Sequence, residues 1–82
     1  MAQRARVEIE FCEPCFYTQE AIKLAGELLL YHASQIDAVT IVPSDGGVFD
    51  VRIDGKKVYS MFDTGRYPTT QEIAAALQAR SQ

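Results

Sequence analysis

Polar and apolar residues alternate near the start of the chain and then change to a longer period. Positions 6–11 (Arg-Val-Glu-Ile-Glu-Phe) place apolar side chains on one side and charged ones on the other, which predicts a strand. From about residue 17 to 34 the apolar residues recur at helical spacing, so a helix is expected, with Thr18 as its N-cap. Its apolar stripe is predicted to comprise Ile22, Ala25, Leu28, Leu29 and either His32 or Ala33.

Two more strands are predicted in the middle of the chain. Residues 36–42 and 48–53 are rich in β-branched and aromatic side chains, which suit a half-buried sheet. Pro43 and the Ser-Asp-Gly-Gly segment that follows it separate the two strands with a turn.

The last third of the chain predicts a hairpin and a helix. Asp54-Gly55 is a favoured two-residue hairpin turn, so residues 58–62 are expected to return as an antiparallel fourth strand. After a polar loop over 63–68, Thr69 and Glu72 have the spacing of a capping box, which predicts the start of a final helix.

The predicted element order is therefore β-α-β-β-β-α. A helix between the first two strands implies a parallel crossover, whereas the last two strands form a hairpin. This is the minimal thioredoxin-like arrangement, an α/β fold with a four-stranded mixed sheet and two helices. Residues 1–82 are expected to form a single domain.

Composition and charge narrow the function classes. The net charge is −3 and the eight basic residues are scattered, so nucleic acid is not expected as a partner. No stretch approaches ~18 consecutive apolar residues and the N-terminus lacks a signal-peptide core, so no membrane partner and a cytoplasmic location are expected. In such a compartment, closely spaced cysteines are more often metal-binding or catalytic than structural.

The only two cysteines, Cys12 and Cys15, lie where the first strand gives way to the first helix. A helix N-terminus stabilises a thiolate, and two thiols two residues apart can close a disulfide. Glu13 and Pro14 between them are expected to tune the pair: the carboxylate opposes thiolate formation and the proline stiffens the loop. Thiol redox chemistry is the favoured interpretation, and a reducing rather than strongly oxidising couple is expected.

Other interpretations of the cysteines stay open from the sequence. A structural zinc site needs four ligands, and His32 is the one nitrogen donor left, far along the helix. Copper carriers also place one such cysteine pair after a first strand, but they end in a strand rather than a helix. Two buried, inert cysteines are the third alternative.

Three ordered motifs resemble the selenoprotein W-like (Rdx) family, relatives of selenoproteins W, T and H. They are Phe-Cys-Glu-Pro-Cys-Phe at 11–16, Gly-Gly-Val-Phe-Asp-Val at 46–51, and the hairpin and Gly-Arg-Tyr-Pro loop at 54–68. The resemblance spans nearly the whole chain. It implies a thioredoxin-like fold and an oxidoreductase-like thiol protein with poorly defined substrates.

The resemblance also bears on which sulfur reacts first. In selenocysteine-containing relatives the selenium occupies the second position, which corresponds to Cys15 here. Thioredoxin geometry and the exposure expected at a strand end favour Cys12 as the attacking residue. Both cysteines are assigned to the catalytic site, with Cys12 preferred as attacker.

Six further residues are candidate substrate contacts: Glu13, Pro14, Phe16, Gly46, Gly47 and Arg66. The glycines occupy the place before the third strand where thioredoxin-like proteins set a substrate-binding cis-proline, and they would let a partner backbone approach closely. A plain turn at the glycines is an equal alternative, and an exposed, solvated role is the commoner one for an arginine such as Arg66. Phe11 is expected in the core.

The predicted function is a small thiol-disulfide redox protein that reduces a partner disulfide or sulfenic acid. No bound cofactor is expected, and glutathione or a thioredoxin-reductase-like system would recycle the dithiol. The alternatives are a redox-sensitive protein-interaction module without turnover and a metal carrier. The oligomeric state is not predicted.

Overall fold

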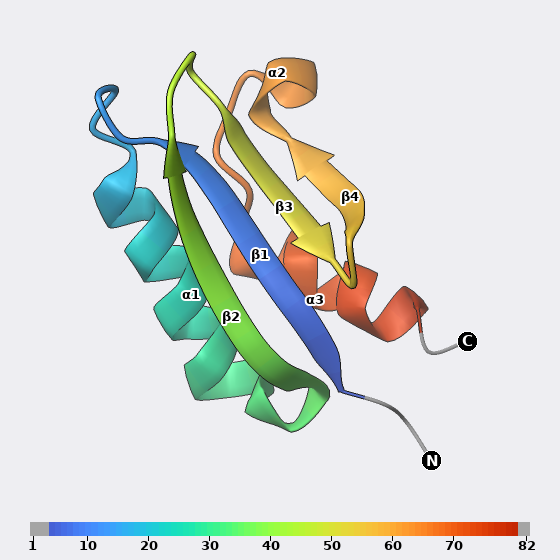
Figure 1. Cartoon of the computed structure of the whole chain (residues 1–82). Helices are drawn as coiled ribbons and strands as arrows, with labels where there is room; N and C mark the ends of the chain where they lie inside the picture. The colour runs from blue at the N-terminus through green and yellow to red at the C-terminus, as the bar shows by residue number, and fades with distance from the viewer. Residues whose placement is uncertain (1–3, 81–82) are drawn as a thin grey trace.

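The computed structural model describes residues 4–80 and contains one four-stranded sheet with helices against it (Figure 1). The strands are β1 (Ala5–Cys12), β2 (Ile36–Ser44), β3 (Phe49–Ile53) and β4 (Lys56–Ser60). The helices are α1 (Thr18–His32), the 3₁₀ turn η1 (Ala33–Gln35), α2 (Met61–Thr64) and α3 (Thr70–Ala79). Figure 1 shows α1 and α3 on the same side of the sheet, with the β1–α1 loop and α2 at one end.

The sheet has the order β2-β1-β3-β4, with β1 at its centre. β1 pairs parallel with β2 and antiparallel with β3, and β3 pairs antiparallel with β4. The predicted mixed sheet is therefore confirmed. The register aligns Cys12 with Ser44 on one side and Phe11 with Phe49 on the other. The C-terminal end of β1 thus lies between the end of β2 and the start of β3.

The alternation in β1 and β3 separates a buried face from a charged one. Val7, Ile9 and Phe11 are buried, as the alternation predicts. On the opposite face, Arg52 binds Glu10 through an ion pair of 3.1 Å. The helices cover the apolar face, and the core lies between them and the sheet. Its buried members include Leu24, Leu28, Phe49, Val51, Ile73 and Leu77.

Helix α1 presents a different face to the sheet from the one predicted. Ala25 and Leu28 are buried as expected, but Ile22 and Leu29 are 56% and 48% exposed, so their assignment to the buried stripe is wrong. The buried residues of α1 are Ala21, Leu24, Ala25 and Leu28. Small alanine side chains let the helix backbone approach the sheet closely, and the helix is turned so that they face it.

Two helix starts also differ from the sequence prediction. Thr18 is the first residue of α1 rather than its N-cap; Tyr17 holds the cap position without a side-chain hydrogen bond. Residues 61–62, predicted as strand, begin the short helix α2. The Ser60 hydroxyl accepts a hydrogen bond from the Phe62 N–H at 3.3 Å and caps this helix, so the chain turns out of the sheet after β4.

The predicted capping box at the start of α3 is confirmed. The Thr69 hydroxyl accepts the Glu72 N–H at 3.1 Å, and the Glu72 carboxylate accepts the Thr69 N–H at 2.8 Å. Among the helices of residues 4–80, none combines the length and the apolar character needed to cross a bilayer.

Candidate functional site

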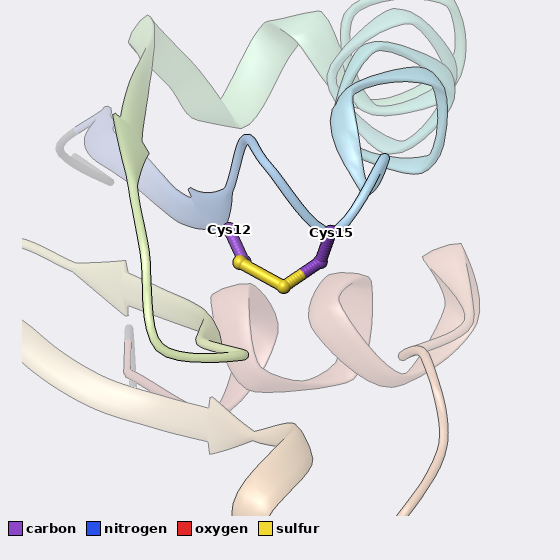
Figure 2. Close-up of a disulfide and its surroundings, with 2 residues drawn as sticks. All are labelled: Cys12 and Cys15. Carbon is purple, nitrogen blue, oxygen red and sulfur yellow. A yellow bond between two sulfur atoms is a disulfide. The ribbon is translucent and has the colours of Figure 1, made fainter.

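The two cysteines are joined by a disulfide between the end of β1 and the turn before α1 (Figure 2). The sulfurs are 2.05 Å apart and the Cα atoms 5.3 Å apart. This Cα separation is within the ordinary range for disulfides, so the loop closes without displacing the backbone. The expected proximity of the two thiols is therefore confirmed.

Backbone hydrogen bonds hold the loop that carries this disulfide. The Phe16 N–H donates to the Glu13 carbonyl at 3.0 Å, which closes a four-residue turn with Pro14 in its second position. Proline is favoured there because its fixed φ suits the turn. The Tyr17 N–H donates to the Cys12 carbonyl at 3.3 Å and leads the chain into α1. The turn thus presents Cys15 to Cys12.

The two cysteines differ in exposure, in the opposite sense to the prediction. Cys12 is fully buried (0% exposed), whereas Cys15 is half-buried. Cys12 is still part of the sheet, because its N–H donates to the Val48 carbonyl at 2.8 Å and neighbouring strands flank it. Strand-end exposure therefore does not support Cys12 as the attacking sulfur, and the more accessible residue is Cys15.

Helix α1 begins three residues after Cys15, at Thr18. The electrostatic effect of a helix terminus falls off within its first turn. Cys15 lies outside that turn, so the stabilisation of its thiolate by α1 is weaker than placement inside the helix would provide.

Phe16 separates Cys15 from the helix and is unusual in two respects. It is 89% exposed, and its backbone has φ of 65°, a left-handed conformation that costs a bulky residue about 1–2 kcal/mol. The tight turn at the disulfide and the entry into α1 impose this geometry. A large apolar ring is thus held in solvent beside the sulfurs, whereas Phe11 is buried as predicted.

The glycine pair between β2 and β3 lies next to the disulfide loop. The Glu13 N–H donates to the Ser44 carbonyl at 2.9 Å, and Figure 2 shows the β2–β3 loop passing beside the disulfide. Gly46 and Gly47 have φ of 76° and 80°, a region that glycine enters at no steric cost. The loop that carries Gly46 and Gly47 therefore lies next to the cysteines, and a substrate contact at the glycines stays a prediction.

Side chains that the sequence did not single out complete the surroundings. The Phe62 ring of α2 is 67% exposed, and one of its carbons lies 3.9 Å from where a Cβ on Gly47 would be. Tyr17, which follows Phe16 in the chain, forms a cluster with Phe49 and Tyr67, with ring centroids 5.3–6.4 Å apart. Burial, and then the neighbouring Tyr17 and Glu20, raise the pKa of Tyr67.

The sequence contains local signals for the short helix α2, which the prediction of a strand over 58–62 missed. Ser60 is a good N-cap residue, and Gly65, with φ of 75°, ends the helix in the left-handed conformation. Together they bracket Met-Phe-Asp-Thr as one helical turn. The aromatic cluster has no local signature, because its three rings come from distant parts of the chain.

The side chain of Arg66 forms an ion pair with Glu72, near the start of α3. Its guanidinium makes two parallel hydrogen bonds of 2.8 and 2.6 Å to the Glu72 carboxylate and lies 5.9 Å from the centroid of the Tyr59 ring. These bonds, with those from Thr69, lower the pKa of Glu72 to about 2, and Glu72 raises the pKa of Arg66. Arg66 is thus neither simply solvated nor directed to the sulfurs by these contacts.

The Arg66–Glu72 pair predicts a measurable titration. The pKa of Glu72 is lower in the folded protein than the ordinary glutamate value of 4.5, so the ionised carboxylate stabilises the fold above pH 4.5. This stabilisation is lost as the pH falls from 4.5 toward about 2. Side-chain NMR should find Glu72 titrating near 2, and Arg66→Gln should move that pKa upward. Lys56→Gln, at the exposed hairpin between β3 and β4, is the control and should leave it unchanged. A Glu72 pKa near 4.5 in the unmodified protein would contradict the pairing.

Within residues 4–80, no group of three or more His, Cys, Asp and Glu side chains is arranged to hold a metal ion. The reduced cysteine pair would offer two soft sulfur ligands. His32, the nitrogen donor considered from the sequence, ends α1 at the far end of that helix.

Comparison with known proteins finds relatives over nearly the whole chain. A model of the Rdx family matches residues 6–79. Migration and invasion enhancer 1 of Bos taurus is 27% identical over 78 residues, which cover 93% of this chain. The aligned region covers 64% of that relative, so the chain spans less than two thirds of its length.

Two solved bacterial structures share the fold. A selenoprotein W-related protein from Vibrio cholerae superposes with a TM-score of 0.90 at 22% identity, covering 98% of this chain and 100% of that one. A protein from Bordetella parapertussis gives a TM-score of 0.87 at 24% identity, with coverage of 95% and 99%. The thioredoxin-like arrangement expected from the element order is confirmed, with α2 as an additional short helix.

Proposed function

Since the chain belongs to the Rdx family, we propose that it is a small thiol-disulfide redox protein whose reactive group is the Cys12–Cys15 pair. The observation that carries the proposal is the pairing of a half-buried cysteine with a fully buried one across a short turn. A redox dithiol needs one sulfur that a partner can reach and a second that only the first can reach. The partial exposure of Cys15 and the burial of Cys12 support these two roles.

The proposed reaction starts from the reduced protein. The Cys15 thiolate attacks one sulfur of a partner disulfide, and the other partner sulfur leaves and takes up a proton. Cys12 then loses its proton and attacks the Cys15 sulfur of the mixed disulfide, which releases the second partner thiol. The partner gains two electrons and two protons, and the protein ends as the Cys12–Cys15 disulfide. With a sulfenic acid as substrate, the first attack releases water instead of a thiol.

Recycling requires two electrons from another thiol. Glutathione and a thioredoxin-reductase-like system are the two candidate donors, and neither needs a cofactor bound to this chain. Glu13 lies between the two cysteines in sequence, and its negative charge near them disfavours the thiolate and suits a reducing couple. A reducing compartment such as the cytoplasm would keep the pair in its active dithiol form.

A coupled disulfide-reduction assay tests this proposal. The full chain, at catalytic concentration, is mixed with a small neutral disulfide or a protein disulfide and recycled either by glutathione with its reductase or by a thioredoxin system. We expect many substrate disulfides reduced per protein molecule with at least one donor. If each protein molecule reduces at most one substrate disulfide, whichever of the two donor systems is used, the proposal is contradicted.

A second candidate function is a redox-sensitive interaction module without turnover. The exposed Phe16 and Phe62 rings beside the disulfide favour it, because a change in the loop on reduction would alter an apolar surface. This candidate predicts that a partner binds one redox state at least about tenfold more tightly, while the coupled assay shows no turnover. Binding measured in both redox states separates the two functions.

A further inference from the structure

The apolar side chains around the disulfide come from two separate segments. Phe16 follows Cys15 directly, and Phe62 reaches the β2–β3 loop from α2, where it lies within 3.9 Å of the Gly47 position. Both rings are mainly exposed, and Phe16 is held outward by a left-handed backbone. Apolar side chains exposed together at one end of a domain can mark a surface that a partner protein covers.

The same end of the molecule carries exposed negative charge. Glu13 lies between the cysteines, Asp45 follows Ser44 in the loop bonded to Glu13, and Asp63 follows Phe62 in α2. In the described part of the chain, none of these three carboxylates lies within ion-pair distance of a cationic side chain. Arg66, the nearest cation to Asp63 in sequence, is held by Glu72. We call Phe16, Phe62, Glu13, Asp45 and Asp63 the disulfide rim.

We propose that the disulfide rim selects protein segments that carry basic and apolar side chains beside their disulfide, in preference to glutathione. This inference rests on the proposed redox function and names its substrate class. Basic side chains are attracted to the three carboxylates, which raises the rate of encounter. An apolar side chain covers the two rings and removes them from water. Glutathione disulfide is anionic and hydrophilic, so the rim repels its charge and gains little by contacting it.

Disulfide exchange with matched substrates tests the inference. The reduced full chain is mixed with three peptide disulfides of equal length: Lys and Phe beside the cystine, Glu and Phe, or Lys and Ser. Glutathione disulfide and a small neutral disulfide are measured alongside, each as a second-order rate constant. We expect the Lys/Phe peptide to react at least about tenfold faster than the Glu/Phe peptide at low ionic strength, with the ratio falling toward one at about 1 M salt.

Rim variants assign the preference to its residues. Glu13→Gln, Asp45→Asn and Asp63→Asn together should remove most of the preference for lysine. Phe16→Ser and Phe62→Ser should each reduce the preference for phenylalanine, which is the ratio of the Lys/Phe rate to the Lys/Ser rate. In the double variant this ratio should fall by about tenfold. Asp37→Asn and Leu30→Ser are matched controls at the opposite end of the fold and should change neither preference. Rates with the neutral disulfide normalise any direct effect on the sulfurs.

The outcomes separate the two proposals. Equal normalised rates for the peptides, or glutathione disulfide reacting as fast as the Lys/Phe peptide, would overturn the rim inference and leave the redox function standing. Failure to reduce even the neutral disulfide would overturn the redox function itself. A lysine preference that survives neutralisation of all three carboxylates would also overturn the rim inference.

Discussion

Replacing Cys15 with serine should lower disulfide reduction by at least about 10³-fold, because the serine hydroxyl is not ionised and cannot act as the attacking sulfur does. Replacing Cys12 with serine should also stop turnover, but at a later step. Cys15 would still attack, and without its resolving partner the mixed disulfide would persist. Mass spectrometry of each variant after incubation with a disulfide substrate should find the stable adduct on Cys15 of the Cys12→Ser protein.

The two single variants together decide the order of attack. The double variant, with serine at both positions, is the control for non-specific adducts and should carry none. A stable adduct on Cys12 of the Cys15→Ser protein, with none in the Cys12→Ser protein, would reverse the order proposed from exposure. The selenium position in the family relatives and the half-buried state of Cys15 point to the same residue.

Replacing Phe49 with alanine should lower the free energy of unfolding by about 3–5 kcal/mol, a large part of the total for a domain of this size. Phe49 is fully buried, pairs with Phe11 across the sheet and lies 5.3 Å from Tyr67 between ring centroids. Its removal leaves a cavity in the core beside Tyr17 and Tyr67. Urea unfolding of the oxidised protein measures the loss.

Phe62→Ala is the matched control for Phe49, because the same ring is removed from a mainly exposed position. Its free energy of unfolding should stay within about 0.5 kcal/mol of the unmodified protein. A loss below about 1 kcal/mol for Phe49→Ala would mean that the Phe49 ring is not a tightly packed part of the core. Equal losses for the two variants would mean that Phe62 is also part of the core.

Local sequence patterns were sufficient to predict those elements whose structure depends only on neighbouring residues. Strand β1 alternates with period two, so its buried face could be read directly, and Val7, Ile9 and Phe11 are buried as predicted. The hairpin turn at Asp54-Gly55 and the capping box of Thr69 and Glu72 depend on neighbouring residues alone, and both are present. The element order then left few possible topologies, and the mixed sheet followed.

The sequence predictions were wrong where contacts with residues distant in sequence determine which side chains are buried. In α1, apolar residues occupy more than one face, and packing of Ala21 and Ala25 on the sheet chose which of them is buried. A strand end is commonly exposed, but Cys12 is covered because the register places Ser44 and Val48 beside it.

The sequence by itself determined that two thiols lie at the junction between the first strand and the first helix of a thioredoxin-like domain, because strand period, turn residues and cysteine spacing are local properties. Only the tertiary structure decided which sulfur is accessible and what surrounds it. Burial depends on the strands on either side of β1, and the ring of α2 meets the glycine loop through folding alone. The Phe-Cys-Glu-Pro-Cys-Phe segment therefore specified the reactive group, and the packing around it specified the direction from which a partner can reach it.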